Sequence, residues 1–503
     1  MTSFVQRAKS FLFENKTRGQ TVIKNTVWLS IANVGGRLLK AIIIIYGARV
    51  LGAADYGVFS YAVTLAGFFT IFIDPGINFV LIREGAKLSK ERLRSLFAQT
   101  LIFKLGCIAL SAFVVVAVAP IFSTLPGAKA LLPLVALIVI FDNMREFFSS
   151  FFRAEEKMQK EAAAMLATNL GIVVFGFILM TISPTPLYFT GAYAAGSGIG
   201  ACIALWLGRD MFAGPSPKAS MNHLFGIMKA AWPFAIAGGL GSLLTSTDIL
   251  IISWMRAATD VGIYSGAIRI VNLLYLIPNI VLLSTMPLLS RLAKNESEKF
   301  RDVIEKILSY VFLISIPLSL GGAILGTEIM RLVFGPTYAD GGISFSILAL
   351  TIVFDYAGLI IINALFAYDR QKSFIVSTAI GAAINISLDL ILIPRWGIAG
   401  SAVATLAAQI ASNSYLWHSM QNVNAFSILP KIRKIIAAGI CMAGTTMVLL
   451  LVTHTPAAIN IIVSGIVYCT ALYALKEPAL MKIKTLVVTG LSRPQAGIGR
   501  SSG

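Results

Sequence analysis

The chain has 503 residues, of which 57% are hydrophobic and only 13% are charged, and its mean hydropathy is +0.82. In soluble globular domains roughly a quarter of the residues are charged, so this composition excludes a soluble protein and predicts a polytopic membrane protein. A net charge of +18 would also suit a nucleic-acid-binding protein, but in a membrane chain Lys and Arg are expected to collect in cytoplasmic loops.

Apolar segments that are long enough to cross a bilayer as helices, which takes about 20 residues, recur along the whole chain. We predict fourteen spans, at 26–48, 57–82, 96–120, 131–152, 162–182, 188–208, 228–254, 262–290, 304–325, 342–367, 373–393, 398–419, 435–453 and 457–475. The second span contains Asp74-Pro75-Gly76, where we expect a kink rather than a split. An even number of spans places both termini on the same side of the membrane.

The distribution of basic residues indicates the orientation of these spans. Five Lys or Arg fall in the predicted external loops and five lie within the spans, so 31 of the 41 lie in segments that we assign to the cytoplasm. This assignment satisfies the positive-inside rule, and the inverted topology violates it. We therefore expect both termini to be cytoplasmic. The same distribution explains the basic surplus, so no nucleic-acid partner is expected.

One motif of pattern D-x-G-[VI]-[FY]-S-x-A occurs twice, as DYGVFSYA at 55–62 and as DVGIYSGA at 260–267. Each copy opens a long apolar stretch that ends in a basic loop. If each half has an even number of spans, the halves share an orientation, which is the parallel-repeat plan of many secondary transporters. The predicted fold class is an all-α polytopic membrane protein with about 14 transmembrane helices. These form two six-helix lobes in parallel repeat plus two C-terminal helices.

A linker-like segment, RDMFAGPSPKASMNH at 209–223, marks the boundary between the repeats. The predicted organisation is a cytoplasmic N-terminal segment at 1–24, a first lobe at 25–208, a cytoplasmic linker at 209–227, a second lobe at 228–420, spans 13 and 14 within 421–475 and a cytoplasmic tail at 476–503.

The seventh span contains a candidate hinge between the two halves. Proline removes a helix hydrogen bond and glycine adds backbone freedom, and both weaken the first half of this span. The residues are Pro233, Gly238, Gly239 and Gly241. The alternative is that these small residues permit close packing between helices.

The sequence has no constellation that is typical of an enzyme or a metal site. The predicted external loops are short, and no G-x-x-x-x-G-K-[ST] phosphate cradle occurs. Neither the three histidines nor the four cysteines have the spacing of metal ligands. We therefore expect no catalytic residue, no metal and no cofactor.

Charged residues inside the spans are the main candidates for function, because each costs roughly 2.5 to 3.5 kcal/mol on insertion scales. Arg37 and Lys40 lie near the middle of the first span, and Asn33 lies one turn earlier on the same helical face. Two cations without an acid on their own helix require an anion, a wet cavity or a partner helix. An ion pair with Asp74 is the structural alternative to a cavity that binds an anionic substrate.

A second polar stripe lies on the eighth span, just after the second copy of the motif. It contains Arg269 and, three residues later, Asn272. Arg269 either faces the same cavity as Arg37 and Lys40 or reaches the external membrane surface with its long side chain.

The fourth span contains Asp142, Arg145 and Glu146, and Asp142 can meet Arg145 at a spacing of three residues. We interpret this pair as local neutralisation of charge.

Four single acids within the spans are candidates for ion coupling. An acid in such a place can carry a proton or coordinate Na⁺, since burial and nearby charges change its affinity for protons. These acids are Asp74, Asp248, Asp355 and Asp389. Each of them could instead be the counter-ion of Arg37 or Lys40, and the sequence does not choose between the two roles.

Six segments of the chain resemble a known group of transporters. They cover roughly residues 20–420 and are YGARVLGAADYGVFSYA (46–62), DPGINFVLIREGA (74–86), VGIYSGAIRIVNLLYLIPN (261–279), MPLLSRL (286–292), LVFGPTYADGG (332–342) and GIAGSAVATLAAQ (397–409). Together they are similar to the polysaccharide-biosynthesis or Wzx-type oligosaccharide flippases of the multidrug/oligosaccharidyl-lipid/polysaccharide (MOP) exporter superfamily.

The resemblance implies two six-helix lobes around a V-shaped central cavity, and alternating access. It also implies that an undecaprenyl-diphosphate-linked oligosaccharide repeat unit passes from the inner to the outer leaflet of the bacterial inner membrane. The product would be a surface polysaccharide such as O-antigen, capsule or exopolysaccharide. Arg37, Lys40 and Arg269 match basic cavity positions of related flippases, which would suit the diphosphate.

Other functions stay open at this point. Fourteen spans also occur in peptidoglycan-precursor (lipid II) flippases. A cation-coupled drug exporter of the same superfamily would be expected to have an acidic cavity, which Arg37 and Lys40 disfavour. A membrane-embedded enzyme is disfavoured by the short loops, and a scaffold for the biosynthetic complex is a further rival. Expected partners are the lipid-linked oligosaccharide, membrane lipid, and the polymerase and chain-length proteins of the pathway.

Overall fold

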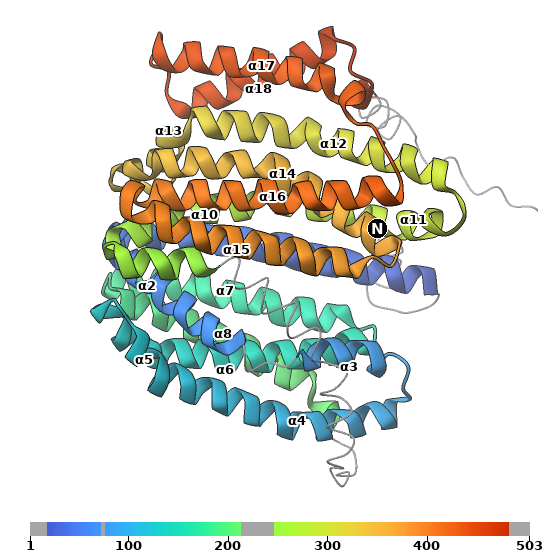
Figure 1. Ribbon diagram of the computed structural model, residues 1–503. Coiled ribbons are helices and arrows are strands. Elements are labelled where there is room, and N and C mark those ends of the chain that lie inside the picture. The colour runs from blue at the N-terminus through green and yellow to red at the C-terminus, as the bar shows by residue number, and fades with distance from the viewer. Residues whose placement is uncertain (1–17, 72–75, 213–245, 482–503) are drawn as a thin grey trace, which may run out of the picture. The chain divides into compact units, whose positions relative to one another are not determined.

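The computed structural model describes residues 18–71, 76–212 and 246–481, and every regular element in these ranges is helical (Figure 1). Eleven helices in these ranges are long and apolar enough to cross a membrane. One of them carries the first two predicted spans, while α16 (Ile398–Val423) and the short helix Ser246–Met255 cover the twelfth span and part of the seventh. All fourteen predicted spans are thus helical wholly or in part. The predicted all-α membrane fold is confirmed, as expected where lipid offers the backbone no hydrogen-bond partner.

Two glycines shape the first two spans. Gly52 has φ 75° and ψ 173°, which divides α2 (Arg18–Ile71) into two helices, and glycine adopts this φ without steric cost. We expected a loop at 49–56, but the backbone there is helical on both sides of Gly52. Gly76 has φ 74° and precedes α3 (Ile77–Gly85). Because this conformation is not helical, the second span is interrupted at Gly76, and the expectation of a kink alone is wrong.

The helices form two compact units, which we describe separately. Unit 1 comprises Met1–Leu276, Val333–Gly341 and Thr378–Ala404, and unit 2 comprises Ile277–Leu332, Gly342–Ser377 and Thr405–Gly503. The predicted six-helix lobes stay a prediction.

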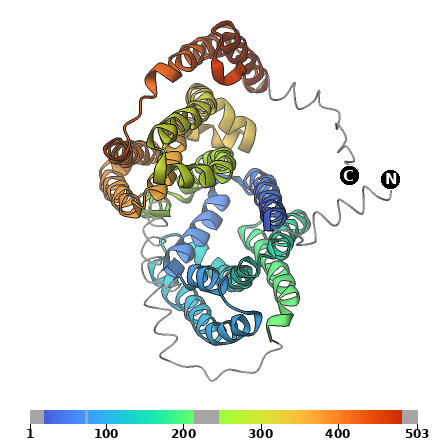
Figure 2. The same ribbon diagram turned by 90° about the vertical axis from the view of Figure 1, so that its right-hand side faces the viewer.

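Unit 1 contains the helices of the first six spans, which Figure 2 shows nearly end-on. After α3 come α4 (Lys90–Phe113), the π-helical turn η1 (Val114–Val118), α5 (Ala119–Phe122), α6 (Pro126–Ala154), α7 (Met158–Ile182), α8 (Pro186–Leu207) and the short η2 (Arg209–Phe212). Both α6 and α8 begin with proline, whose missing N–H and fixed φ suit the first turn of a helix. Among these helices α7 packs against α8 and α2, and α6 packs against α8.

Phenylalanines join the beginning of α4 to the end of α6, next to the basic loops. The ring of Phe97 on α4 lies 5.4 Å from those of Phe147 and Phe148 and 4.8 Å from that of Phe151, between ring centroids. All four side chains are buried. Such aromatic pairs contribute about 0.5–1.5 kcal/mol beyond the area that they bury, so this cluster fixes the end of α6.

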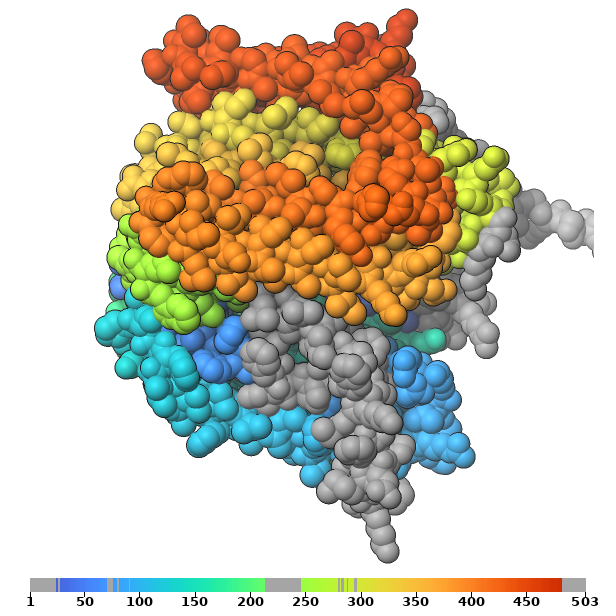
Figure 3. Space-filling model, viewed as in Figure 1, coloured from blue at the N-terminus to red at the C-terminus, as the bar shows by residue number. Residues whose placement is uncertain are grey.

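The second half of the chain supplies helices to both units. Its elements are α10 (Ala258–Leu274), α11 (Leu276–Asn295), α12 (Ser297–Ile324), α13 (Gly326–Phe334), η3 (Pro336–Gly341), α14 (Gly342–Ala367), α15 (Gln371–Trp396), α16, α17 (Leu429–Leu451) and α18 (Ala457–Ala474). In unit 2, α12 packs against α14 and α17, and α17 packs against α18. The space-filling view shows α17 on the outer surface of unit 2 (Figure 3). The exposed side chains of α17 include Leu429, Ile440 and Leu451, as expected for a helix that faces lipid.

Candidate functional site

The two copies of the repeated motif lie against each other in unit 1. Gly57 of the first copy is on α2, and Gly262 of the second copy is on α10. A Cβ atom on Gly57 would lie 1.9 Å from the carbonyl oxygen of Ala258, and one on Gly262 would lie 1.8 Å from that of Ala53. No side chain fits in so little space, so the glycines of the motif determine where α2 and α10 cross.

Cations from three of the predicted spans come together around Lys40. Lys40 of α2 is exposed, and Arg269 of α10 lies close enough to act on it electrostatically. Asp142 and Arg145 of α6 lie within the same range of Lys40. We call these four residues the cationic cluster. Arg145 has two acids in ion-pair range, Asp142 and Glu146, whereas Lys40 and Arg269 have no ion pair in the described ranges. Positive charge therefore remains within membrane-spanning helices, where charge is costly unless an anion or water compensates it.

Aromatic residues form one wall of the cationic cluster. The Nζ atom of Lys40 lies 5.9 Å from the ring centroid of Tyr193 on α8, in a cation–π contact. The ring of Tyr193 lies 5.2 Å from that of Phe59, in the first motif copy, and 5.3 Å from that of Phe189. The hydroxyl of Tyr193 is buried and has no hydrogen-bond partner among the described residues. A buried hydroxyl without a partner is costly, so it is available to a bound molecule.

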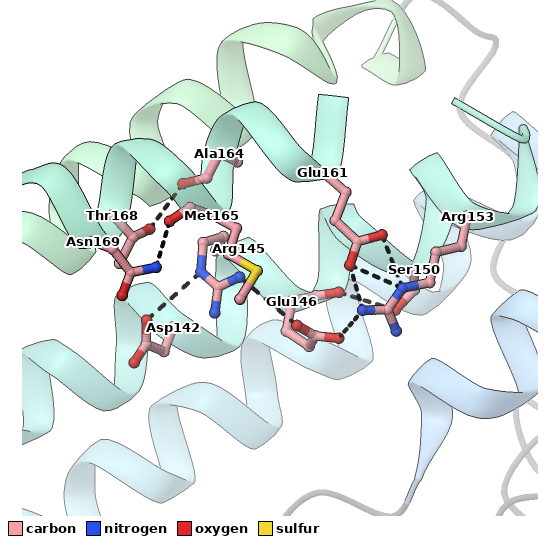
Figure 4. Close-up of polar contacts among 10 residues, drawn as sticks. All are labelled: Asp142, Arg145, Glu146, Ser150, Arg153, Glu161, Ala164, Met165, Thr168 and Asn169. Atoms are coloured by element: carbon pink, nitrogen blue, oxygen red, sulfur yellow. Dashed lines mark hydrogen bonds and ion pairs between the residues drawn. The ribbon is translucent and has the colours of Figure 1, made fainter. Parts of the chain in front are cut away.

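A chain of ion pairs runs from the cationic cluster along α6 to the start of α7 (Figure 4). Arg145 lies 3.7 Å from Asp142 and 3.9 Å from Glu146, so the predicted contact between Asp142 and Arg145 is present. Arg153 lies 3.2 Å from Glu146, and its Nε donates to both carboxylate oxygens of Glu161, at 3.0 and 2.9 Å. The side chain of Glu161 is only 5% exposed, and its only ion pair in the described ranges is with Arg153. This pair ties α6 to α7 and so supports the position of Arg145.

Two of the four candidate coupling acids lie together in unit 1. Asp248, on Ser246–Met255, and Asp389, on α15, are both buried, and their carboxyl groups interact with each other. Tyr264 of the second motif copy donates a hydrogen bond from its hydroxyl to Oδ2 of Asp248, at 2.5 Å. Ser401 of α16 lies beside Asp389. Two interacting carboxyl groups cannot easily both be charged, so this pair is suited to a shared proton or a bound cation.

The other two candidate acids are Asp355 and Asp74. Asp355 on α14 belongs to unit 2, where Nδ2 of Asn413 on α16 donates to its Oδ1 at 3.3 Å. Asp74 lies outside the described residues, and so does the whole candidate hinge of Pro233, Gly238, Gly239 and Gly241.

Three further predicted residues are exposed on their helices: Arg37 and Asn33 on α2, and Asn272 on α10. Nδ2 of Asn33 donates to the carbonyl oxygen of Leu29 at 2.8 Å, so this amide is turned toward its own helix. The Arg37 side chain makes no ion pair or hydrogen bond with another residue in the described ranges. The binding role of these residues, of Lys40 and of Arg269 stays a prediction.

Sequence reasoning missed two buried charges of this region. Lys104 of α4 is buried, and its Nζ donates to Oδ1 of Asn143 on α6 at 3.1 Å, one residue from Asp142. Glu161, which binds Arg153, is the other. Both lie within or at the start of predicted spans, where any charged residue signals a partner on a neighbouring helix.

A polytopic helical fold with cations clustered inside its spans is that of a membrane transporter. Residues 22–293, more than half of the chain, match the family described as "Polysaccharide biosynthesis protein", and the chain belongs to this family. A relative from Haloferax volcanii, described as "Probable low-salt glycan biosynthesis flippase Agl15", is 28% identical over 78% of this chain and 82% of its own length.

Solved structures show the same fold. The lipid II flippase MurJ in an inward closed conformation has a TM-score of 0.75 and 18% identity, over 89% of this chain and 98% of that one. An inward-facing multidrug resistance MATE family transporter of the MOP superfamily has a TM-score of 0.63 and 13% identity, over 79% of this chain and 98% of that one. The resemblance inferred from the motifs is confirmed, and the relatives are flippases and transporters rather than enzymes.

Proposed function

We propose that this protein is a flippase that carries a polyprenyl-diphosphate-linked oligosaccharide repeat unit from the inner to the outer leaflet of the bacterial inner membrane. Transport would proceed by alternating access, both termini would be cytoplasmic, and the pathway would make a surface polysaccharide. The polymerase and chain-length proteins of that pathway would receive the unit. Membership of the family supports a role in transport for polysaccharide biosynthesis. The cationic cluster supports the proposal that the substrate is linked to a diphosphate.

The cationic cluster has the chemistry that a diphosphate requires. The guanidinium group of Arg269 can bind two phosphate oxygens at once, whereas Lys40 offers a point charge. Arg145 is already paired with Asp142 and Glu146 and would contribute less. Arg37 lies one turn before Lys40 on α2 and is exposed, so it can add a further cation. A sugar and a diphosphate cannot cross hydrocarbon unaided, because each polar group would lose its hydrogen bonds with water. The cluster would replace this water while the polyprenyl tail stays in lipid.

Coupling to an ion would use the buried carboxyl pair. Carboxylate and hydroxyl oxygens suit either H⁺ or Na⁺, and Asp248, Asp389 and the Tyr264 hydroxyl supply them in one place. Since Tyr264 and Arg269 are both on α10, a change at the carboxyl pair can move the helix that carries a cation of the cluster. Asp355 belongs to unit 2, where it accepts a hydrogen bond from Asn413, and is the weaker candidate.

The test is to identify the lipid-linked sugars that accumulate in the inner leaflet of a strain that lacks the gene. This strain is then complemented with the gene for the double variant Lys40→Ala/Arg269→Ala or, as the matched control, with the gene for Lys129→Ala. Lys129 is an exposed cation of α6 outside the cluster. We expect a polyprenyl-linked repeat unit to accumulate and surface polysaccharide to disappear, with rescue by Lys129→Ala but not by the double variant.

Other outcomes of this experiment decide against the proposal. Accumulation of lipid II in place of a repeat unit would indicate a peptidoglycan-precursor flippase. No accumulation at all would favour a drug exporter or a scaffold. Full rescue by the double variant would show that the cationic cluster is not the substrate site.

A further inference from the structure

A pocket of about 440 Å³ lies in unit 2, where α12 and α17 begin and the chain leaves α18. This volume is within the usual range of ligand sites, about 300–1,000 Å³. The pocket lies at the helix ends that adjoin basic loops, on the side that the charge distribution assigns to the cytoplasm. Its charged lining consists of Asp302, Lys306, Lys431, Arg433, Lys434 and Glu477.

Glu477 has an unused acceptor in this pocket. Its side chain is nearly fully buried, with 3% of the residue exposed, and its Oε2 has no hydrogen-bond partner among the described residues. Its Oε1 accepts only a long bond, 3.4 Å from the backbone N–H of Ala479. A buried carboxylate oxygen without a partner is costly, and a hydrogen-bond donor that also carries positive charge would compensate it best.

The cations of the pocket are not equivalent. Lys431 is not available to a bound anion, because its ammonium group pairs with Glu305 at 2.5 Å. Nζ of Lys434 donates to the carbonyl oxygen of Lys476 at 3.2 Å, which holds this ammonium beside the residue that precedes Glu477. Lys306, Arg433 and Lys434 thus remain for an anion, while Asp302 and Glu477 face the same space. A nearly balanced set of charges suits a molecule that carries both signs.

We infer that this pocket binds the headgroup of phosphatidylethanolamine from the adjacent leaflet. The phosphate would lie among Lys306, Arg433 and Lys434, and the primary ammonium would donate to Glu477. Basic pockets between the cytoplasmic ends of membrane helices are known to take lipid headgroups. The acyl chains would follow the outer face of α17, where Leu429 is 66% exposed and Ile440 is 64% exposed.

Two other lipids fit less well for physical reasons. Phosphatidylglycerol offers hydroxyl donors but no cation to Glu477, so its headgroup would leave the buried carboxylate without a counter-charge. Phosphatidylcholine carries a charge but no N–H, so it cannot donate a hydrogen bond. The inference therefore predicts that the pocket prefers phosphatidylethanolamine to both other lipids, an order that the net charge of the lipids alone would not give. This prediction does not depend on which substrate the protein transports.

The test is native mass spectrometry of the purified full chain, with equimolar phosphatidylethanolamine, phosphatidylglycerol and phosphatidylcholine of identical acyl chains. We expect the wild type to retain phosphatidylethanolamine preferentially. Glu477→Gln keeps the shape of the side chain but removes its charge, and should lower the ratio of phosphatidylethanolamine to phosphatidylglycerol by about tenfold. The double variant Arg433→Ala/Lys434→Ala should lose both lipids.

Lys299→Ala is the matched control, because Lys299 lies on α12 outside the pocket and pairs with Glu296. It should retain lipids as the wild type does. Preference for phosphatidylglycerol in the wild type, or an unchanged ratio in a monodisperse Glu477→Gln protein, would overturn the inference. Displacement of the lipid by millimolar inorganic phosphate or by undecaprenyl diphosphate would assign the pocket to phosphate alone, and would overturn it as well.

Discussion

At the aromatic position of the repeated motif, the first copy has Phe59 and the second has Tyr264. Phe59 packs on Phe189 and Tyr193, beside Lys40, whereas the Tyr264 hydroxyl donates to Asp248 in the buried carboxyl pair. The backbones around them are alike, since each copy places its glycine against the other helix. The two equivalent positions therefore have different neighbours. Phe59 lies near a cation, whereas the hydroxyl that distinguishes Tyr264 binds one of two acids.

This comparison shows how a duplicated framework can acquire two chemistries. The glycines of the motif have equivalent positions in both copies, because each lies against the other helix where α2 and α10 cross. The serines of the motif, Ser60 and Ser265, are both buried. The aromatic position has different partners in the two copies. Under the proposed function, the first copy supports the site for the diphosphate and the second supports the site for the coupling ion.

The largest effect is expected where the two copies meet. Gly57→Leu or Gly262→Leu would place a branched side chain where even a Cβ atom lies within 2 Å of a backbone oxygen. Neither helix can yield without losing its packing, so we expect no folded protein from either variant. The yield of monodisperse protein after size-exclusion chromatography measures this effect.

Gly67→Leu is the control for this prediction. Gly67 is on the same helix, and a Cβ atom there would meet nothing within 4 Å. It should give normal yields. If the two motif variants also fold normally, the glycine crossing is not what joins the copies.

The next effect concerns the second copy alone. Tyr264→Phe makes this position resemble the first copy and removes the donor to Asp248. A buried acceptor that loses its partner costs about 1–3 kcal/mol, so the melting temperature should fall. The dependence of transport on pH or Na⁺ should weaken too. A thermal melt measures the change in melting temperature, and a transport assay at several pH and Na⁺ values measures the ion dependence. An unchanged ion dependence would show that Tyr264 has no role in coupling.

The smallest effect concerns the aromatic wall of the first copy. Tyr193→Phe keeps the ring under Lys40 and removes a buried hydroxyl without a partner, so stability should rise slightly, by about 1 kcal/mol at most. Tyr193→Leu also removes the cation–π contact, which contributes about 0.5–1 kcal/mol at such sites. Thermal melts compare the two variants. Equal melting temperatures would show that the ring does not stabilise Lys40.

The sequence predicts the helical fold well, because span length and the distribution of basic residues are local properties. It also predicts the contact between Asp142 and Arg145, since three residues separate them on one helix. It does not predict the pairing of Asp248 with Asp389 or of Arg153 with Glu161, because each depends on which helices become neighbours. The interruption at Gly76 was missed for another reason: Asp74-Pro75-Gly76 indicates a weak point in a helix but not the backbone angle.

The most direct test of the account is a measurement of whether the cationic cluster binds the diphosphate. The affinity of the purified protein for undecaprenyl diphosphate and for undecaprenol should be compared in the wild type, in Lys40→Ala/Arg269→Ala and in Lys129→Ala. The account predicts that the wild type and Lys129→Ala prefer the diphosphate, and that the double variant loses about 10- to 100-fold in affinity for it alone. Equal affinities of all three proteins for the diphosphate would contradict the account.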